Sequence, residues 1–446
     1  MSETNEEPVA APAPDDDDDN DDDAVLANES PVVVDLAWLN RKKTIGDLPH
    51  AVLVSIFAAV GNQNWVRRTF PLVCKEWAEL YRSKDASPLH ETLEVDFRKE
   101  LERARADAHA PRWRAPPLRH RIVRASRVIA WAEARAGSVK RLRLDGVFDG
   151  ALEDFGPGDL AALVGGLGGG GLGGGGGGAR SSLEELRVDS GTCEQHRQRF
   201  WEAVRDSVAP AGRLRSLAVE GCFAVATEAD VEPLGRQLAR SLEELVLVTK
   251  FWDPDSSRGG QSGLPRFPES LCDLAGLRRL KLEGHFRIMA IPARISALKK
   301  LETVQIRYCR LLSLPKELGQ LSRVTTLDLS FNRSLGNAPP SEAIPAALGK
   351  LKSLRVLNLR CCGLRTFPAF VGELGSLEML DLSFNDFQLD DAIDVLIKGC
   401  PLLRELGLYK GLRTVPWTPE SKAHLEVFKA RLRAENPKVK VLHDYD

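Results

Sequence analysis

The chain has 446 residues, 43% of them hydrophobic and 28% charged, with a formal net charge of −2. This length exceeds one ordinary compact domain, so we expect several units or an elongated repeat array with a buried core. Residues 1–30 hold 12 acidic side chains and no Lys or Arg, which leaves a net charge of +10 on the rest. Such a basic body attracts acidic partners, but no nucleic-acid-binding motif accompanies it, so nucleic acid is not an expected partner.

The cysteines and the N-terminus indicate the cellular compartment in which the protein resides. The eight cysteines form no Cys-x-x-Cys pair, which favours reduced thiols over a disulfide framework or a zinc site. The N-terminus is acidic and lacks the apolar segment of a secretory leader. The longest uncharged stretch, residues 160–179, is mostly glycine and too weakly apolar to span a bilayer. We therefore expect a protein of the cytoplasm and/or the nucleus, with no membrane segment.

Residues 1–43 are predicted to form a disordered acidic tail. The runs Asp15–Asp19 and Asp21–Asp23 cannot collapse, because like charges at this density repel one another. The tail is either a solubilising arm or an interaction segment.

Residues 44–85 have a different character and are predicted to form a small helical unit. Pro49 suits a first helical turn. The apolar residues after it recur at helical spacing: Val52, Leu53, Ile56, Phe57 and Val60. A unit of about 40 residues is very small for an autonomous core, so part of its apolar surface is expected to need a partner.

Residues 86–136 are predicted to be a mostly helical, basic connector. Its acid-free run contains Arg112, Arg114, Arg119, Arg121, Arg124 and Arg127. We expect these arginines on a solvated helix face, while Ile122, Ile129 and Trp131 fasten the helix to the next domain.

Residues 137–418 are repetitive. The template Leu-x-x-Leu-x-Leu-x-x-(Asn/Cys) occurs about ten times, starting at Val139, Leu183, Leu214, Leu242, Leu277, Leu301, Val324, Leu354, Leu377 and Leu403. A single strand-and-turn unit cannot bury its apolar side alone, so stacked neighbours must supply the missing wall. Asn or Cys at the turn is expected to satisfy buried backbone groups, at Cys222, Cys309, Asn332, Cys362 and Asn385.

The segments that return from one repeat to the next differ along the array. In the later repeats, proline and apolar residues at triplet spacing predict a convex arm of tight, extended or 3₁₀ structure, at 267–277, 291–301, 314–324, 344–354 and 367–377. In the earlier repeats, helical spacing predicts α-helices through Phe200, Val204 and Val208, and through Val231, Leu234 and Leu238.

Two further segments complete the array. The Gly-rich stretch 165–178 lacks the Gly-Lys-Ser/Thr ending of a phosphate-binding loop and is predicted to be a flexible linker. Residues 419–446 are predicted to form a C-terminal cap, with a helix that buries Leu425, Phe428 and Leu432 and a short strand at 439–442.

The segment from Leu48 to Trp77 resembles the F-box. The matching pieces are Leu48-Pro49, Ile56-Phe57, and Leu72-Val73-Cys74-Lys75 followed by Trp77. The resemblance implies binding to the Skp-family adaptor of a Skp–cullin–F-box ubiquitin ligase, and to the cullin and RING subunits through that adaptor. Matched residue by residue, it assigns adaptor contact to Leu48, Pro49, Leu53, Ile56, Phe57, Val73, Cys74 and Trp77. This segment departs from the family pattern at His50 and Ala51, where acidic residues usually stand, and at Pro71. The alternative is a helical cap on the repeats.

The repeats independently resemble plant-type and intracellular leucine-rich-repeat proteins. The predicted fold class is therefore an α/β solenoid, a leucine-rich-repeat horseshoe with a parallel concave sheet, preceded by a small all-α F-box. The combination resembles F-box/leucine-rich-repeat proteins, which select other proteins for ubiquitination and proteasomal degradation. The alternative is an intracellular leucine-rich-repeat scaffold or signalling regulator without a ligase link. No Ser/His/Asp signature, His-Glu-x-x-His motif or nucleotide fingerprint is present, so we expect no catalytic residue, cofactor or metal site.

The protein substrate is expected on the concave face, because strand alternation sends the residues between the leucines there. The predicted contacts are Arg279, Lys281, Arg307, Tyr308, Phe331, Arg360, Phe384 and Tyr409. We place the four aromatic residues at one repeat position, as a broken aromatic column with Arg307 and Arg360 beside it. Aromatic and Arg side chains most often carry binding energy, which favours this column over the convex arm.

Overall fold

The computed structural model divides the chain into two units, residues 1–62 and 63–446, and all described residues lie in the second. The described residues are 92–96, 138–147, 162–164, 182–190, 194–221, 224, 226–249, 263–337, 343–387, 390–409 and 419–442. The predicted tail (1–43), the F-box segment (44–85) with its eight adaptor-binding residues, and the Gly-rich linker (165–178) lie outside them.

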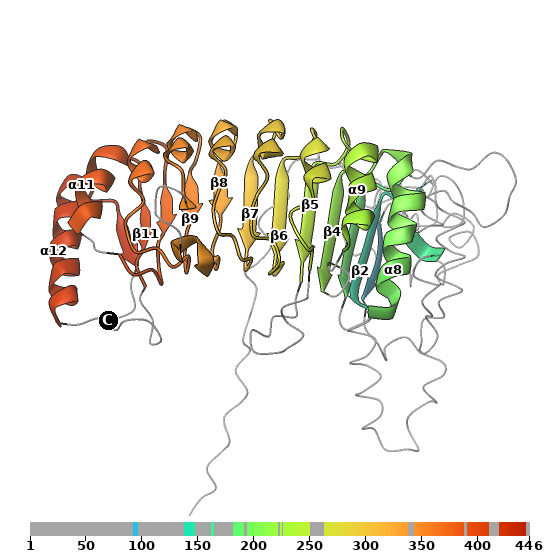
Figure 1. Cartoon of the computed structure of the whole chain (residues 1–446), viewed down its shortest axis with the longest axis horizontal. Coiled ribbons are helices and arrows are strands. Elements are labelled where there is room, and N and C mark those ends of the chain that lie inside the picture. The colour runs from blue at the N-terminus through green and yellow to red at the C-terminus, as the bar shows by residue number, and fades with distance from the viewer. Residues whose placement is uncertain are drawn as a thin grey trace, which may run out of the picture. The chain divides into compact units, whose positions relative to one another are not determined.

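The described strands form one parallel sheet in which each of the twelve strands is hydrogen-bonded to the next in chain order (Figure 1). The strands are β1 (Thr92–Asp96), β2 (Arg141–Val147), β3 (Glu185–Ser190), β4 (Ser216–Gly221), β5 (Glu244–Val248), β6 (Arg279–Glu283), β7 (Thr303–Arg307), β8 (Thr326–Asp328), β9 (Val356–Asn358), β10 (Met379–Asp381), β11 (Glu405–Gly407) and β12 (Lys440–Leu442). This sheet confirms the predicted solenoid of stacked parallel strands.

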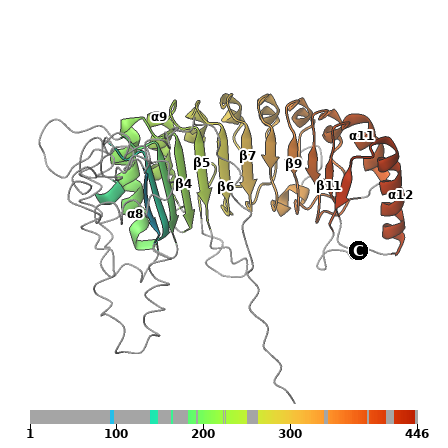
Figure 2. The same ribbon diagram turned by 180° about the vertical axis from the view of Figure 1, so that it is seen from behind.

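The described connections between strands are α-helical before β4 and β5, mostly 3₁₀ from β5 to β10, and α-helical again before β11 and β12. The α-helices are α8 (Glu194–Ala203), α9 (Glu228–Gln237), α11 (Asp390–Gly399) and α12 (Pro419–Glu435), and α8 continues into a π-helical turn η4 (Val204–Val208) and a 3₁₀ turn η5 (Ala209–Ala211). The later 3₁₀ helices are η8 (Glu269–Asp273), η9 (Ala293–Ala297), η10 (Lys316–Gln320), η11 (Arg333–Asn337), η12 (Ala346–Lys350) and η13 (Ala369–Glu373). Figure 2 shows the same array from behind.

The repeat leucines form the core, as the template predicts. Leu327 of β8 pairs in register with Leu357 of β9, which pairs with Leu380 of β10, and all three are fully buried. Burying a Leu side chain stabilises a protein by roughly 1.5–3 kcal/mol. Because each leucine is covered by the repeats on both sides, this stabilisation depends on neighbouring repeats being folded together.

Of the tight, extended or 3₁₀ forms predicted for the returning arms, all five arms adopt the 3₁₀ form. Each of η8, η9, η10, η12 and η13 begins directly after a proline that occupies the N-cap position: Pro268, Pro292, Pro315, Pro345 and Pro368. Proline supplies a fixed φ near the required value and lacks the N–H that a helix start leaves unpaired.

The helices predicted in the early repeats are also confirmed. Phe200 of α8 and Val204 and Val208 of η4 are buried in the core, as are Val231 and Leu234 of α9. Figures 1 and 2 show α8 and α9 beside β2 to β5, where they take the place of the later 3₁₀ turns.

The prediction of a helical connector over 86–136 is wrong for Thr92–Asp96, which forms β1 and pairs in parallel with β2. The register places Leu93 beside Leu142 and Val95 beside Leu144, so the segment repeats the apolar alternation of the other strands. His90 stands where the template requires its first leucine. The remainder of the predicted connector lies outside the described residues.

The predicted role of the turn residues is confirmed at Asn332, Cys362 and Asn385, whose side chains hydrogen-bond backbone groups of the preceding repeat, whereas Cys222 lies outside the described residues. Asn332 is fully buried, accepts the Leu311 N–H at Oδ1 (3.3 Å) and donates Nδ2–H to the carbonyls of Ile306 (2.7 Å) and Leu329 (2.8 Å). Cys362 takes the same position in the next repeat, where its thiol donates to the Leu329 carbonyl at 3.2 Å. The side chain at this position therefore ties consecutive repeats together.

At the C-terminal end, α12 and β12 occupy the places predicted for a helix and a strand. Leu425, Phe428 and Leu432 of α12 are buried, and β12 pairs with β11. The two elements cover apolar groups of the last repeat that would otherwise meet water.

Candidate functional site

The candidate site is the face of the sheet that points away from the leucine core. In β6 and β7 buried residues alternate with residues that are exposed or half-buried, as expected where one face of a strand packs and the other faces solvent. The outward residues of β6 are Arg279, Lys281 and Glu283. The predicted substrate contacts lie on this open face or at the turn directly after it.

Aromatic residues occupy a turn position with left-handed backbone. Tyr308, Phe331, Cys361 and Phe384 have φ angles of 48°, 63°, 55° and 59°. They are equivalent in the repeats: Tyr308 N–H donates to the Ser330 carbonyl, Phe331 N–H to Arg360, and Cys361 N–H to Ser383. A left-handed conformation costs a residue with a side chain roughly 1–2 kcal/mol.

Glycine occupies the same position one repeat earlier. Gly284 has a φ of 79°, and its N–H donates to the Arg307 carbonyl, so it is the equivalent of Tyr308. A Cβ atom at Gly284 would lie 2.1 Å from the Thr249 Oγ1 atom, which excludes any side chain there. From β7 onward the position admits side chains, and three of the four found there are aromatic.

The structure corrects the predicted position of Tyr409. The Phe384 N–H donates to the Tyr409 carbonyl, and β10 pairs Asp381 with Gly407, so Tyr409 is the equivalent of Ser383 and not of Phe384. Tyr409 therefore belongs to the row that contains Arg307 and Arg360. The error arose because the repeat that starts at Leu403 was aligned by residue type rather than by counting from its leucines.

The predicted residues nevertheless form two contact clusters. The Tyr308 and Phe331 rings are stacked, with centroids 4.1 Å apart and planes 8° from parallel, and the Arg307 guanidinium carbon lies 5.7 Å from the Tyr308 ring centroid. The Arg360 guanidinium carbon lies 4.2 Å from the Phe384 centroid and 5.9 Å from that of Tyr409. We call these six residues the aromatic–arginine patch.

The charges of the patch are balanced within the sheet. Lys281 Nζ lies 3.3 Å from Glu283 Oε2, and the same carboxylate oxygen lies 3.8 Å from Arg307 Nη1. Arg307 Nε also lies 3.5 Å from Asp328 Oδ2 and donates to Ser330 Oγ at 3.1 Å. These contacts hold the Arg307 side chain in place, and 29% of that side chain remains exposed.

Arg360 and Arg279 each have an acidic neighbour, but only Arg360 lies beside the aromatic rings. The Arg360 side chain is 32% exposed and has an acidic neighbour, Asp381 Oδ2, at 3.8 Å. Arg279 lies at the opposite end of its strand from Glu283 and pairs with Glu244 at 3.2 Å. The structure therefore brings Arg360 into the patch and leaves Arg279 outside it.

Burial raises the pKa of Tyr308, so its hydroxyl stays protonated at neutral pH. Burial also raises the pKa of Cys309 to about 12 and raises the pKa of Cys362. These cysteines are therefore thiols, which act as weak donors and not as nucleophiles. No group of His, Cys, Asp and Glu suited to hold a metal ion occurs among the described residues.

A cavity of about 600 Å³ is lined by residues of η11, η12 and η13 and of the segments before η12 and η13. Its lining includes Leu335, Ile344, Arg365, Phe367 and Phe370. None of the predicted substrate contacts lines it. The open face and the cavity are thus separate features.

The sequence-based prediction missed three exposed arginines next to the patch, Arg287, Arg310 and Arg333. They lie beyond the strands, outside the alternation that selected the other residues. The available signal was that Arg310 and Arg333 each directly follow the Cys or Asn of the turn.

Comparison with known proteins agrees with the fold. A family model described as "Leucine-rich repeat region" matches residues 267–391. The TMV resistance protein N of Nicotiana glutinosa is 29% identical over 219 residues, 42% of this chain, and the chain spans only 19% of that protein's length. The described part of the chain is a leucine-rich-repeat solenoid.

Two solved structures illustrate the likeness. A leucine-rich-repeat protein of Leptospira interrogans is 18% identical with a TM-score of 0.37, over 70% of this chain and 74% of its own. An internalin of Listeria monocytogenes is 14% identical with a TM-score of 0.36, over 70% of this chain and 82% of its own. Within the described residues, no helix is both long enough and apolar enough to cross a membrane.

Proposed function

We propose that the chain is a non-catalytic adaptor that binds a partner protein on the open face of its leucine-rich-repeat sheet. The aromatic–arginine patch carries this proposal. It combines four aromatic rings with two half-exposed arginines at, or just beyond, the C-terminal ends of strands that pair with one another. Aromatic and Arg side chains are enriched at the centres of protein interfaces, and side chains that neighbouring repeats already hold in place lose little conformational freedom on binding.

The backbone at Phe331 and Phe384 supports the same proposal. Both residues have positive φ angles that glycine adopts without cost. Folding alone would therefore be served by glycine, as it is at Gly284. Keeping aromatic rings at a strained position is consistent with a role in binding.

The test uses this backbone property. Replacing Phe331→Gly and Phe384→Gly removes two rings and relieves the left-handed strain, so the fold is expected to persist. Loss of two interface rings of about 2 kcal/mol each weakens binding by roughly 10³-fold. Proximity labelling with the full chain should lose its specific partners in this variant.

A matched control replaces two exposed apolar residues away from the patch, Leu402→Ala and Val427→Ala, which are 54% and 63% exposed. The control should keep the wild-type partner set. If the glycine variant also keeps that set while remaining folded, the patch is not the binding surface.

The finer proposal is that the partner is a substrate for ubiquitination. In this view residues 44–85 bind a Skp-family adaptor, which connects the chain to cullin and RING subunits in the cytoplasm or the nucleus. Its support is the F-box resemblance of Leu48-Pro49, Ile56-Phe57 and Val73-Cys74 with Trp77. The ligase chemistry belongs to other subunits, and this chain supplies proximity.

Co-purification tests the ligase link separately. Wild-type chain should retain a Skp-family adaptor and a cullin, and Leu48→Ala with Pro49→Ala should lose both. Retention of the adaptor by this variant, or its absence from the wild-type complex, would favour a leucine-rich-repeat scaffold or signalling regulator without a ligase link.

A further inference from the structure

Three exposed arginines stand at the edge of the sheet where β6, β7 and β8 end. Arg287, Arg310 and Arg333 are all exposed, and among the described residues none of the three forms an ion pair. Arg307 at the end of β7 and Arg360 just after β9 both have acidic neighbours within 4 Å. Uncompensated positive charge is therefore concentrated beyond the strand ends.

Backbone hydrogen bonds place these arginines on adjacent repeats. The Arg310 N–H donates to the Ile288 carbonyl at 3.2 Å, and the Leu312 N–H donates to the Met289 carbonyl at 2.9 Å. These two bonds hold the segments 287–289 and 310–312 side by side.

The next repeat is joined in the same way. The Leu311 N–H donates to Oδ1 of Asn332, the residue directly before Arg333. The three arginines therefore follow one another on consecutive repeats.

Exposed apolar side chains alternate with the arginines. Ile288 and Leu311 are buried, whereas Met289 and Leu312 are 44% and 45% exposed. An extended segment sends alternate side chains to opposite sides, so Met289 and Leu312 lie on the solvent side with Arg287 and Arg310. We call Arg287, Met289, Arg310, Leu312 and Arg333 the arginine edge.

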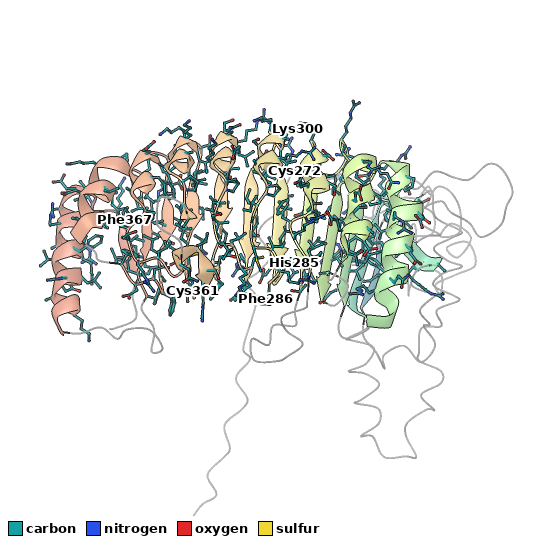
Figure 3. The ribbon with its side chains drawn as sticks, viewed as in Figure 1. Cys272, His285, Phe286, Lys300, Cys361 and Phe367 are labelled. Atoms are coloured by element: carbon teal, nitrogen blue, oxygen red, sulfur yellow. The ribbon has the colours of Figure 1, made fainter. Side chains whose placement is uncertain are left out.

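The arginine edge is continuous with the aromatic–arginine patch. Arg333 Nε donates to Cys361 Sγ at 3.3 Å, and Cys361 occupies the turn position between those of Phe331 and Phe384. Figure 3 shows Phe286 and Cys361 along the same edge of the ribbon, with Lys300 at the opposite edge. A partner on the patch would therefore extend over the arginine edge.

The composition of this edge favours protein over nucleic acid. Arginine with methionine and other apolar residues is the mixture typical of protein interfaces. Strong binding to a nucleic-acid backbone uses many cations along an extended track, and three arginines beside two exposed apolar side chains do not form one.

We propose that the arginine edge binds anionic side chains on the partner segment that occupies the aromatic–arginine patch. This inference rests on the proposed function and adds the chemistry of the partner. A guanidinium offers two parallel N–H donors that match a carboxylate or a phosphate monoester. Three such groups without an ion pair among the described residues are available for both ligands.

The experiment measures retention of three labelled peptide mixtures on the immobilised full chain. The mixtures share degenerate flanking positions that include Phe and Tyr and carry phosphoserine, Glu or Ser at the fixed positions. Retention of the phosphoserine or Glu mixture should exceed that of the Ser mixture by about 10-fold or more. The better retained of the two identifies phosphate or carboxylate as the source of the negative charge.

Two triple variants with the same loss of charge locate the site. Arg287→Gln, Arg310→Gln and Arg333→Gln should reduce retention of the anionic mixture by roughly 10- to 100-fold. The control carries Lys299→Gln, Lys300→Gln and Arg323→Gln, at exposed positions before β7 and β8 that also lack ion pairs among the described residues. The control should stay within about 2-fold of the wild type, because long-range attraction is screened beyond about 8 Å.

Several results would overturn the proposal. They are equal retention of the Ser mixture, full retention by the arginine variant, or equal loss in the control. Tighter, arginine-dependent retention of a labelled single-stranded DNA would identify a nucleic-acid site instead. If the Phe331→Gly and Phe384→Gly variant loses the cellular partner while the arginine variant keeps it, the proposed function stands and the arginine edge has no part in it.

Discussion

Replacing Asn332 by alanine is expected to break the connection between the repeats of β7 and β8. The side chain is fully buried and makes three hydrogen bonds to the backbone, to the Leu311 N–H and to the carbonyls of Ile306 and Leu329. Alanine leaves these three groups without the side chain that satisfies them. At about 1–1.5 kcal/mol for each buried group, the free energy of unfolding should fall by about 3–4 kcal/mol.

Cysteine at the same position provides a graded comparison. The thiol of Cys362, at the equivalent position, still donates one hydrogen bond to the preceding repeat. Asn332→Cys should therefore restore about 1 kcal/mol relative to Asn332→Ala. Urea unfolding followed by far-ultraviolet circular dichroism gives the free energies, and hydrogen exchange reports the Leu311 amide directly.

The reasoning predicts both the size and the place of the effect. Exchange of the Leu311 amide should accelerate in Asn332→Ala before exchange in β4 or β5 does. An alanine variant within about 0.5 kcal/mol of the wild type, with the Leu311 amide still protected, would refute the assigned role of the Asn332 side chain.

Three further predictions follow from buried side chains. Leu357→Ala, at a fully buried position between two repeats, should lower the free energy of unfolding by about 2–5 kcal/mol in urea titrations; a change below about 1 kcal/mol would contradict the packing. Burial lowers the pKa of His285 from 6.5 to about 4, and the neutral ring accepts the Leu264 N–H at Nδ1 and contacts the Leu247 carbonyl through Nε2. Stability from this group is therefore complete above pH 6.5 and is lost as the pH falls toward 4, by up to about 3 kcal/mol. Urea midpoints should fall over this pH range in the wild type and less in His285→Gln, and equal slopes would exclude His285 as the cause. Because burial raises the pKa of Cys309 to about 12, iodoacetamide at pH 7 should leave Cys309 unlabelled until the chain unfolds, as read by mass spectrometry; rapid labelling of folded protein would show that the thiol is accessible.

The local patterns in the sequence were sufficient to predict most of the fold. The leucines of each repeat, the proline before each returning arm and the Asn or Cys at several turns all act on residues close to them in the chain. Their consequences therefore recur from repeat to repeat, as the prolines before η8, η9, η10, η12 and η13 show. The aromatic residues of the open face were found for the same reason, since strand alternation is a local rule.

The pairing of one strand with another was harder to predict from the sequence. Thr92–Asp96 was predicted to be part of a helical connector, but it forms β1. Its hydrogen-bonding partner is the edge of β2, which lies too far along the chain for a local sequence pattern to indicate it. Tyr409 is a different case, since counting from Leu403 already places it in the row of Arg360, and the β10–β11 register agrees with that count. Hydrogen bonding between strands depends on residues that are distant in the chain, so it appears only once the sheet is assembled.

By itself the sequence determined the repeat unit, its buried leucines and the side chains displayed toward solvent. Only the tertiary structure decided which of the charged side chains among them already have an ion-pair partner within the chain. Arg307 and Arg333 look alike in the sequence, yet Arg307 lies against Glu283 and Asp328, whereas Arg333 has no acidic neighbour among the described residues. Ion pairing on an array depends on the charge that the next repeat places about 4.8 Å away, and stacking the repeats is what brings those charges together.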